Sequence, residues 1–254
     1  MSDRKNIYFA SDFHLGSYPE EKSIAREHEI VNWLNHIKSD AKELYLMGDV
    51  FDFWFEYRSV VPKGYIRFLG KLAELADEGV KITFFKGNHD MWMFGYLRDQ
   101  LGANIIDNEL EIIRDGKSFY LHHGDGLGDG DQKYKILKKI FRSKACQWLF
   151  ARLHPNLGIG IAQRWSRSSR VANDIDEIFL GEDKEWLIQY ARQLENTQHF
   201  DFYIFGHRHL SYYLPLSSKS QIINLGEWFK GKSYAVWNGT TLELLQWNNE
   251  LKPE

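Results

Sequence analysis

Five short clusters of metal-binding side chains recur along this chain of 254 residues, and each follows a short apolar run. The clusters are Asp12-Phe13-His14, Gly48-Asp49, Gly87-Asn88-His89-Asp90, His122-His123-Gly124-Asp125 and Gly206-His207-Arg208-His209. Short apolar, aromatic-rich runs bounded by Gly and Asp are typical of buried strands. Because ligands that follow several strand ends can converge at one edge of a sheet, the clusters predict a metal site and an enzyme.

The side-chain types in these clusters favour transition metals. Asp12 and His14 are two residues apart, so both point to the same side of an extended strand end. His207 and His209 repeat that spacing. Oxygen and imidazole ligands without thiolate suit Mn, Fe or Zn better than Ca or a structural zinc site. Two such ions about 3.5–4 Å apart would bind a hydroxide and the phosphoryl oxygens of a substrate.

Taken singly, each cluster has an ordinary structural explanation. A Gly-Asp pair is common turn chemistry, and an isolated Asp-x-His pair often arises by chance. The five clusters in this order, each after a predicted strand, are far more specific for a metal site.

Hydrophobic periodicity predicts the elements that must position the clusters. Strands are expected at about 6–11, 43–47 and 81–86, with helices near 21–38 and 64–78 between them, whose apolar faces include Ile24 and Ile66. This alternation favours βαβ units and a largely parallel sheet. Further strands are expected at 109–114, 117–122, 221–225, 233–237 and 241–247, with turns at Asp115-Gly116 and Asn238-Gly239. The order predicts an α/β protein with two packed sheets flanked by helices.

Between the fourth and fifth clusters lies a segment of unusual charge. Residues 132–173 contain ten Lys or Arg and no Asp or Glu, so they carry +10 while the rest of the chain carries −13. The segment also contains Trp148, Trp165 and several Phe and Leu residues. Such a charge-segregated, amphipathic stretch predicts an inserted helical subdomain. It could dock on an anionic membrane surface, or it could be only a solvated basic face.

Composition limits the binding partners and the cellular compartment that are expected for the protein. The total net charge of −3 indicates no special partner, and nucleic acid is not expected because the basic run is local. Cys146 is the only cysteine, so a reduced cytosolic setting and a buried thiol are expected. No signal peptide and no apolar run approaching the ~20 residues of a membrane span are recognised.

The order of the five clusters resembles the calcineurin-like metallophosphoesterase superfamily. The resemblance implies a single domain over residues 1–254, built as a four-layer αββα sandwich with two metal ions. It implies that one ion is held by Asp12, His14, Asp49 and His209, and the other by Asp49, Asn88, His123 and His207. His89, beside Asn88, would protonate the leaving group or steady the transition state, and Asp90 would orient His89. His122 faces away from His123 and is expected in the core.

Nearly the whole chain is similar to the UDP-2,3-diacylglucosamine pyrophosphohydrolase family of lipid A synthesis. The similarity rests on residues 48–52, on 123–127 with Asp131 and Tyr134, on 161–164 and 169–173, and on Leu225-Gly226-Glu227-Trp228. It implies hydrolysis of that lipid to UMP and 2,3-diacylglucosamine 1-phosphate, with two divalent ions, Mn²⁺ before Fe or Zn. Residues 131–175 would form a helical lid. The substrate contacts that the resemblance implies are Asn88, His89, Asp131, Arg164, Ser169, Arg170, Asn173 and His207.

The lipid substrate implies a cytoplasmic enzyme, peripheral on the cytoplasmic face of the inner membrane. The chain departs from the lipid-hydrolase pattern in three places: His89 stands where many members have Arg, Asp176 aligns with a lid Lys, and residues 54–58 replace a Trp-Ile-Gly-Asp-Asp run. Two alternatives therefore stay open. One is a soluble nucleotide phosphodiesterase or pyrophosphatase, and the other is a scaffold of the same fold without catalysis. Oligomeric state is left open.

Overall fold

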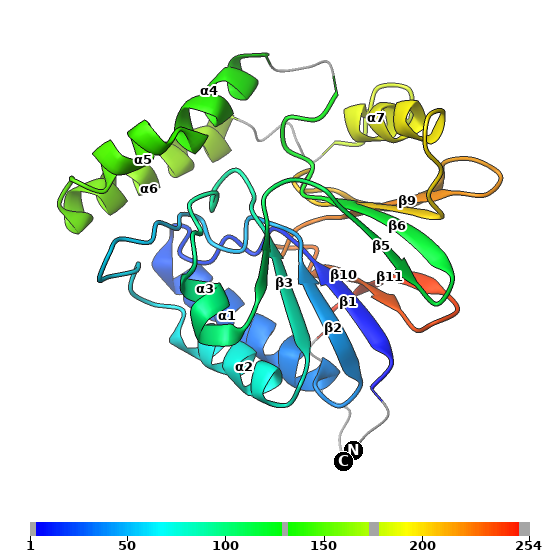
Figure 1. Cartoon of the computed structure of the whole chain (residues 1–254), viewed down its shortest axis with the longest axis horizontal. Coiled ribbons are helices and arrows are strands. Elements are labelled where there is room, and N and C mark those ends of the chain that lie inside the picture. Colours follow the sequence, from blue (N-terminus) through cyan, green and yellow to red (C-terminus); the bar gives the residue numbers. More distant parts are fainter. Residues whose placement is uncertain (1–3, 129–131, 173–177, 249–254) are drawn as a thin grey trace.

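Two β-sheets form the centre of the molecule (Figure 1). The computed structural model describes residues 4–128, 132–172 and 178–248, with only the backbone described at 132–133 and 167–172. The first sheet contains β1 Asn6–Ala10, β2 Ala41–Leu46, β3 Lys81–Phe85, β4 Asn104–Ile106, β10 Ser233–Trp237 and β11 Leu242–Gln246. The second contains β5 Leu110–Arg114, β6 Lys117–His122, β7 Phe202–Phe205, β8 Ser211–Pro215 and β9 Gln221–Leu225. Their spatial orders are β11-β10-β1-β2-β3-β4 and β5-β6-β7-β9-β8.

Parallel pairing runs through the middle of both sheets. The neighbours β1, β2, β3 and β4 are parallel, while β10 and β11 add antiparallel strands at the other edge. In the second sheet β6, β7 and β9 are parallel, and β5 and β8 are antiparallel edge strands. Parallel neighbours bring their carboxyl ends to one edge, where α/β sheets bind ligands.

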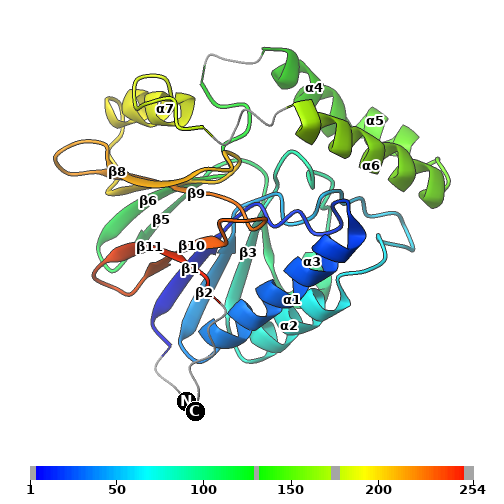
Figure 2. The same ribbon diagram turned by 180° about the vertical axis from the view of Figure 1, so that it is seen from behind.

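Helices cover the outer faces of the two sheets. Helices α1 Glu20–Ile37 and α2 Ile66–Asp77 lie on the first sheet, with the short α3 Tyr96–Leu101 beside them (Figures 1 and 2). Helix α7 Trp186–Glu195 lies on the outer face of the second sheet. The resulting layers, α, β, β and α, confirm the predicted α/β fold of two packed sheets.

Alternation along the strands explains the layered core. On β1, Phe9 points between the sheets and stacks on Tyr45 and Phe119, with ring centroids 5.2 and 6.2 Å away. Tyr8 and Ala10 point the other way, into the cluster under α1 and α2. Because both faces are covered, the strands are near-continuous apolar runs. Full burial of one large apolar side chain contributes about 1.5–3 kcal/mol.

The strands and helices expected in the first ninety residues are confirmed to within two residues at each end. The predicted apolar helix faces are wrong at Ile24 and Ile66, which are 46% and 76% exposed. Ile24 lies six residues before the buried Ile30, and Ile66 lies six residues before the buried Leu72. A separation of six residues turns a side chain about 120° around the helix axis, away from the buried face. The predictions also missed α3, β4, β8 and α7, because short edge strands and brief helices carry little periodicity.

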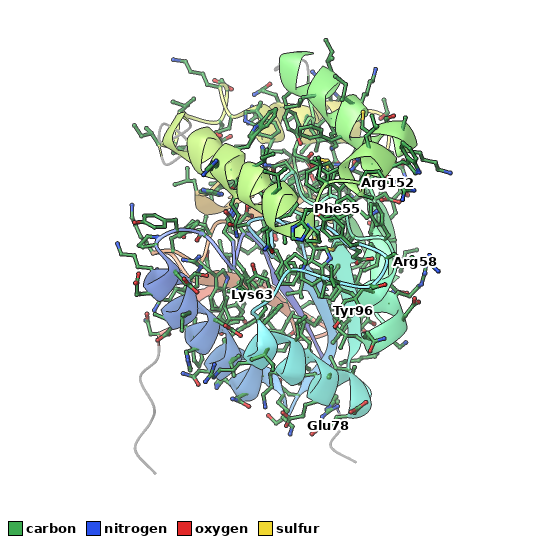
Figure 3. The ribbon with its side chains drawn as sticks, turned by 90° about the vertical axis from the view of Figure 1, so that its left-hand side faces the viewer. Phe55, Arg58, Lys63, Glu78, Tyr96 and Arg152 are labelled. Carbon is green, nitrogen blue, oxygen red and sulfur yellow. The ribbon has the colours of Figure 1, made fainter. Side chains whose placement is uncertain are left out.

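The basic segment folds into three helices, α4 Gln132–Arg142, α5 Lys144–Phe150 and α6 Pro155–Ala172. They lie across the carboxyl-end edge of the sheets (Figure 1). An aromatic cluster attaches them: Phe53, Phe55, Met91 and Trp92 pack against Phe141, Phe150, Ile159 and Ala162. Figure 3 places Phe55 beside these helices and Glu78 at the opposite end of the molecule. The sequence-based prediction of helices is confirmed, and a lid role stays a prediction.

Two predictions from composition can be compared with the described residues. Cys146 is half-buried in α5, so its expected burial in the core is wrong. The cause is that α5 packs on only one side and leaves its neighbour Trp148 57% exposed. Among the described helices, none is long and apolar enough to cross a bilayer.

Candidate metal centre

The predicted ligands lie in the loops at the carboxyl ends of parallel strands. Asp12 and His14 follow β1, Asp49 follows β2, and Asn88 follows β3. His123 follows β6 of the second sheet, and His207 and His209 follow β7. The two sheets therefore each contribute ligands to one edge, and side chains almost 200 positions apart in sequence come within hydrogen-bonding distance.

The ligand loops have an unusual backbone. Asp12, His14, Asp49 and His207 all have positive φ angles, between 44° and 65°, a region that side-chain-bearing residues rarely adopt. Hydrogen bonds between loops maintain this conformation, with Asp12 N donating to Gly48 O at 3.1 Å and His14 N to Asp49 O at 2.9 Å. Residues held in such conformations cluster at functional sites, so the backbone independently indicates a functional site here.

The glycines of the clusters allow the loops to approach one another. A Cβ on Gly87 would collide with the Asp49 carboxylate, and one on Gly48 would collide with the His123 ring. Glycine is thus required in the Gly-Asp and Gly-Asn-His-Asp motifs by close packing. The motif glycines are part of the geometry of the centre, although they supply no ligand.

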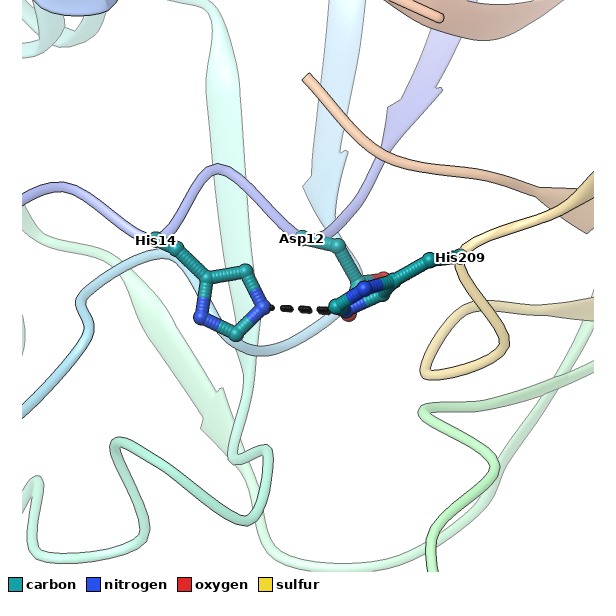
Figure 4. Close-up of side chains that lie close together, drawn as sticks. All are labelled: Asp12, His14 and His209. Carbon is teal, nitrogen blue, oxygen red and sulfur yellow. Dashed lines mark hydrogen bonds and ion pairs between the residues drawn. The ribbon is translucent and has the colours of Figure 1, made fainter. Parts of the chain in front are cut away.

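The first group of candidate ligands is Asp12, His14 and His209 (Figure 4). The two Nε2 atoms of His14 and His209 lie 3.2 Å apart. Asp12 Oδ1 lies 3.7 Å from His14 Nε2 and 3.5 Å from His209 Nε2. Among the described residues, the buried Asp12 Oδ1 has no hydrogen-bond partner. Three converging donor atoms, one of them a buried carboxylate oxygen without a partner, fit a bound cation.

The second group is Asp49, His123 and His207, with Asn88 beside it. His123 Nε2 lies 3.4 Å from Asp49 Oδ2 and 3.3 Å from Asn88 Oδ1. His123 Nδ1 lies 2.7 Å from the carbonyl oxygen of Met47, which can only accept a hydrogen bond. Nδ1 therefore carries a hydrogen, which leaves Nε2 as the atom of this ring that could bind a metal, as in metal-binding histidines.

Asp49 lies between the two groups. Its Oδ2 is 3.8 Å from His14 Nε2 and 3.4 Å from His123 Nε2, so one oxygen faces both groups. Its other oxygen, Oδ1, accepts the backbone N–H of His89 at 2.8 Å. This placement is that of a carboxylate able to bridge two ions.

Histidines balance the buried carboxylates electrostatically. Burial alone raises carboxyl pKa values, but nearby histidines hold the pKa values of Asp12 and Asp49 well below the ordinary range. Burial opposes protonation of His123, yet the Asp49 charge outweighs it and raises the pKa of His123 to about 10. Burial lowers the pKa of His207 to about 4. The centre thus keeps two buried anions that attract positive charge, as divalent ions would supply.

His89 lies at the border of the centre, but Asp90 does not hold its ring. His89 is grouped with His14 and Asp49, and its ring centroid lies 4.7 Å from that of His14. Both Asp90 oxygens accept backbone N–H groups instead, from Gly87 at 2.8 Å and from Val50 and Phe51 at 2.8 and 3.2 Å. The expected orientation of His89 by Asp90 is therefore wrong. Asp90 ties two loops together instead, because its two oxygens accept backbone N–H groups from both of them.

His122 has the structural role expected for it. It is buried, and its Nδ1 accepts the backbone N–H of Gly124 at 2.7 Å. Burial lowers the pKa of His122 to about 3, so the ring stays neutral. Asp125, in the same loop, binds the insertion: its Oδ2 lies 2.6 Å from Lys138 Nζ and accepts the Tyr134 hydroxyl at 2.5 Å.

The predicted substrate contacts on the insertion are only partly visible. Asp131 and Asn173 lie outside the described residues, as do the side chains of Ser169 and Arg170. Arg164 lies on α6 and is exposed. The expectations for these five residues remain predictions.

The candidate ligands at the carboxyl ends of the strands form what we call the metal edge. A cavity of about 220 Å³ lies between the insertion and this metal edge. Asn88, His89 and Asp52 are among its lining residues. The remaining lining is largely apolar and comes from Phe53, Met91, Trp92, Leu137, Phe141, Phe150, Ile161, Ala162 and Trp165, with Tyr134 and Ser166. The cavity therefore joins polar groups of the candidate centre to an apolar chamber beneath the inserted helices.

Two further side chains were not predicted from the sequence. Phe229 follows the Leu-Gly-x-Trp turn and stacks on His14, with ring centroids 5.4 Å apart. The Arg26 guanidinium lies over the Phe229 ring, 4.3 Å from its centroid. Arg26 also donates hydrogen bonds to the carbonyl oxygens of Phe13 and His14 at 2.6 and 2.7 Å. Neither has a motif of its own, so only the contact identifies them.

A two-sheet sandwich with buried carboxylates and imidazoles at the carboxyl ends of its parallel strands defines a metal-dependent hydrolase. The family model described as calcineurin-like phosphoesterase matches residues 5–211, and the chain belongs to that family. Family membership implies divalent metal ions, for which the two ligand groups are plausible sites.

Relatives similar over nearly their whole length carry one name. The chain is 42% identical over 259 residues to a Porphyromonas gingivalis protein named UDP-2,3-diacylglucosamine hydrolase, covering 95% of this chain and 97% of that protein. Proteins of the same name from Nitrosococcus oceani and Actinobacillus succinogenes are 25% and 26% identical. Those matches cover 89% and 87% of this chain, and 88% and 91% of the relatives.

Proposed function

We propose that this protein hydrolyses the pyrophosphate bond of UDP-2,3-diacylglucosamine, releasing UMP and 2,3-diacylglucosamine 1-phosphate. The names of the full-length relatives support this substrate. The structural observation that carries the proposal is the apolar cavity that opens beside Asn88 and His89. A lipid-linked phosphate ester needs an apolar chamber and a phosphate-cleaving centre next to each other, and a soluble nucleotide needs only the second.

Two divalent ions, most readily Mn²⁺, are proposed at the centre. One would be held by Asp12, His14, Asp49 and His209, and the other by Asp49, Asn88, His123 and His207. Bound ions of this kind supply Lewis-acid polarisation of phosphoryl oxygens and activation of a water nucleophile. The mixed oxygen and imidazole donors without thiolate support Mn²⁺, with Fe or Zn also compatible.

The side chains of Asn88 and His89 would contact the reacting phosphate. Both line the cavity, so a phosphate that reaches the centre from the cavity would lie beside them. The Asn88 amide can donate a hydrogen bond to a phosphoryl oxygen. His89 can donate a proton to the leaving oxygen, as a general acid positioned within hydrogen-bonding reach does. Asp90 contributes indirectly, since it holds the Gly87 and Val50 backbone.

The exposed surface of the insertion would meet the membrane that contains the lipid. Trp148, Leu149 and Leu157 are 57%, 60% and 55% exposed on α5 and α6. The Arg152 guanidinium stacks over Trp148, 4.7 Å from the ring centroid, beside the cluster that contains Phe55 (Figure 3). Basic and aromatic side chains together suit an anionic lipid surface, where each nearby Lys or Arg contributes about 1 kcal/mol. We place the enzyme there as a peripheral protein on the cytoplasmic face of the inner membrane.

The test is UMP release from UDP-2,3-diacylglucosamine by purified protein supplied with Mn²⁺, with bis(p-nitrophenyl) phosphate as a simple diester for comparison. We expect UMP to form and the lipid to be strongly preferred. If the diester is cleaved well and no UMP appears, the substrate proposal is rejected and the soluble phosphodiesterase remains. If neither is cleaved and the protein binds no metal, the non-catalytic scaffold is favoured instead.

A further inference from the structure

Ser166 connects the insertion to the candidate centre. It lies on α6 and is only 6% exposed, whereas its neighbours Arg164 and Trp165 are exposed. Its Oγ lies 3.0 Å from Nδ1 of His89, which is 77 positions earlier in the chain. The contact is between a helix of the insertion and a residue adjacent to the ligand Asn88.

The chemistry of this contact defines the state of the His89 ring. Nδ1 of His89 also lies 3.2 Å from the carbonyl oxygen of Asp52. Because a carbonyl oxygen can only accept, Nδ1 must carry the hydrogen, and the Ser166 hydroxyl oxygen accepts the same hydrogen from the other side. The opposite nitrogen, Nε2, then faces the substrate, and it takes up a proton from solvent before it donates one to the leaving oxygen, while Nδ1 keeps its hydrogen.

We propose that Ser166 is a positioning residue for His89, so that α6 completes the active centre by fixing the plane and tautomer of this imidazole. The inference rests on the proposed role of His89. The torsion that turns a histidine ring is broad, and a single acceptor on Asp52 would leave the ring free to pivot. Acid catalysis depends on the direction of the donated hydrogen, and a displacement of about 1 Å can cost about 100-fold in rate.

The kinetic test uses Ser166→Ala and Ser166→Thr, with Ser143→Ala as the matched control. Ser143 also belongs to the insertion, and its side chain makes no capping hydrogen bond to α5. With Mn²⁺ present, we expect Ser166→Ala to lower kcat roughly 10- to 100-fold while KM changes less than about twofold. The loss should be the same for the lipid and for bis(p-nitrophenyl) phosphate. Ser166→Thr, which keeps a hydroxyl, should recover most of the rate, and Ser143→Ala should match the wild type.

A double-mutant cycle with His89→Ala separates positioning from direct binding. If Ser166 acts through His89, Ser166→Ala has no further effect once His89 is removed. An equal loss in both backgrounds, or a rise in KM alone, would overturn the proposal and make Ser166 a substrate contact.

A spectroscopic measurement keeps this inference distinct from the substrate proposal. Long-range ¹H–¹⁵N correlation spectra of Mg²⁺-loaded protein should show the Nδ1-protonated tautomer for His89 and a mixture of tautomers in Ser166→Ala. Unchanged His89 signals in that variant would refute the positioning role whatever the substrate is. Failure to cleave the lipid, with the tautomer shift present, would reject only the substrate.

Discussion

The metal edge and the inserted helices use charge in opposite ways. At the metal edge, Asp12 and Asp49 are buried and compensated at close range by imidazoles. Residues 132–173 carry ten cations and no acid, and they expose Trp148 and Leu149 to solvent. Buried charge is tolerated only where partners are placed closely, so the first pattern indicates chemistry. The second contains no acidic residue of its own, and its exposed cations suit an external partner of opposite charge.

The two regions are also held in different ways. The ligand loops are connected by backbone hydrogen bonds and strained φ angles, which allow little movement. The insertion is attached by the aromatic cluster around Phe55 and by polar contacts such as Lys138 with Asp125. Changes on the outer surface of the insertion should therefore leave the metal edge intact, and the reverse should also hold.

The largest effect is expected from Asp49→Ala. Removing the carboxylate between the two ligand groups should lower turnover of every phosphoester by about 10³-fold or more. Metal content measured by mass spectrometry should fall below two ions per chain. Asp77→Ala, at the exposed end of α2, is the control and should change neither. Full metal content with full activity in Asp49→Ala would show that the bridging assignment is wrong.

Metal removal should affect the metal edge and leave membrane binding by the insertion unchanged. Treatment with a chelator is expected to abolish turnover and lower Tm, because an ion at 100 times its Kd stabilises the fold by about 2.7 kcal/mol. Adding Mn²⁺ back should restore both. Sedimentation with anionic vesicles should be unchanged by the same treatment. Loss of vesicle binding on chelation would contradict the independence of the two regions.

Charge reversal on the insertion should give the converse result. Lys144→Glu combined with Arg152→Glu should weaken binding to phosphatidylglycerol vesicles by at least about tenfold, since each cation near the surface is worth about 1 kcal/mol. Turnover of bis(p-nitrophenyl) phosphate should not change. The matched control, Lys22→Glu with Lys42→Glu on the sandwich, should bind vesicles as the wild type does. Equal binding by both double variants would argue against the membrane surface.

The smallest effect is expected in the aromatic cluster that packs the insertion against the metal edge. Phe55→Leu keeps an apolar side chain at a site that is 1% exposed, and should cost about 1 kcal/mol, or about 2–4 °C in Tm. KM for the lipid should rise several-fold because the apolar chamber loosens, while metal content stays at the wild-type value. A fall in metal content would show that the cluster supports the metal edge directly.

Much of the centre is predictable because its signals are local. A donor such as Asp49 is recognised from its place directly after a strand, and parallel pairing then brings the strand ends together. The role of Asp90 could not be predicted this way, because its partners include Val50, 40 positions away. Ser166 and Phe229 carry no motif, and only contacts with His89 and His14 distinguish them.

The sequence by itself determined the family, the candidate metal-binding side chains and the helical, basic character of the insertion. These follow from residue identity and short spacing, which are fixed along the chain. Tertiary structure alone decided which oxygen of Asp49 faces both ligand groups and where the apolar cavity opens. The cavity exists because residues 134–166 pack over loops at 52–53 and 88–92, and such long-range packing leaves no pattern in a local stretch of sequence.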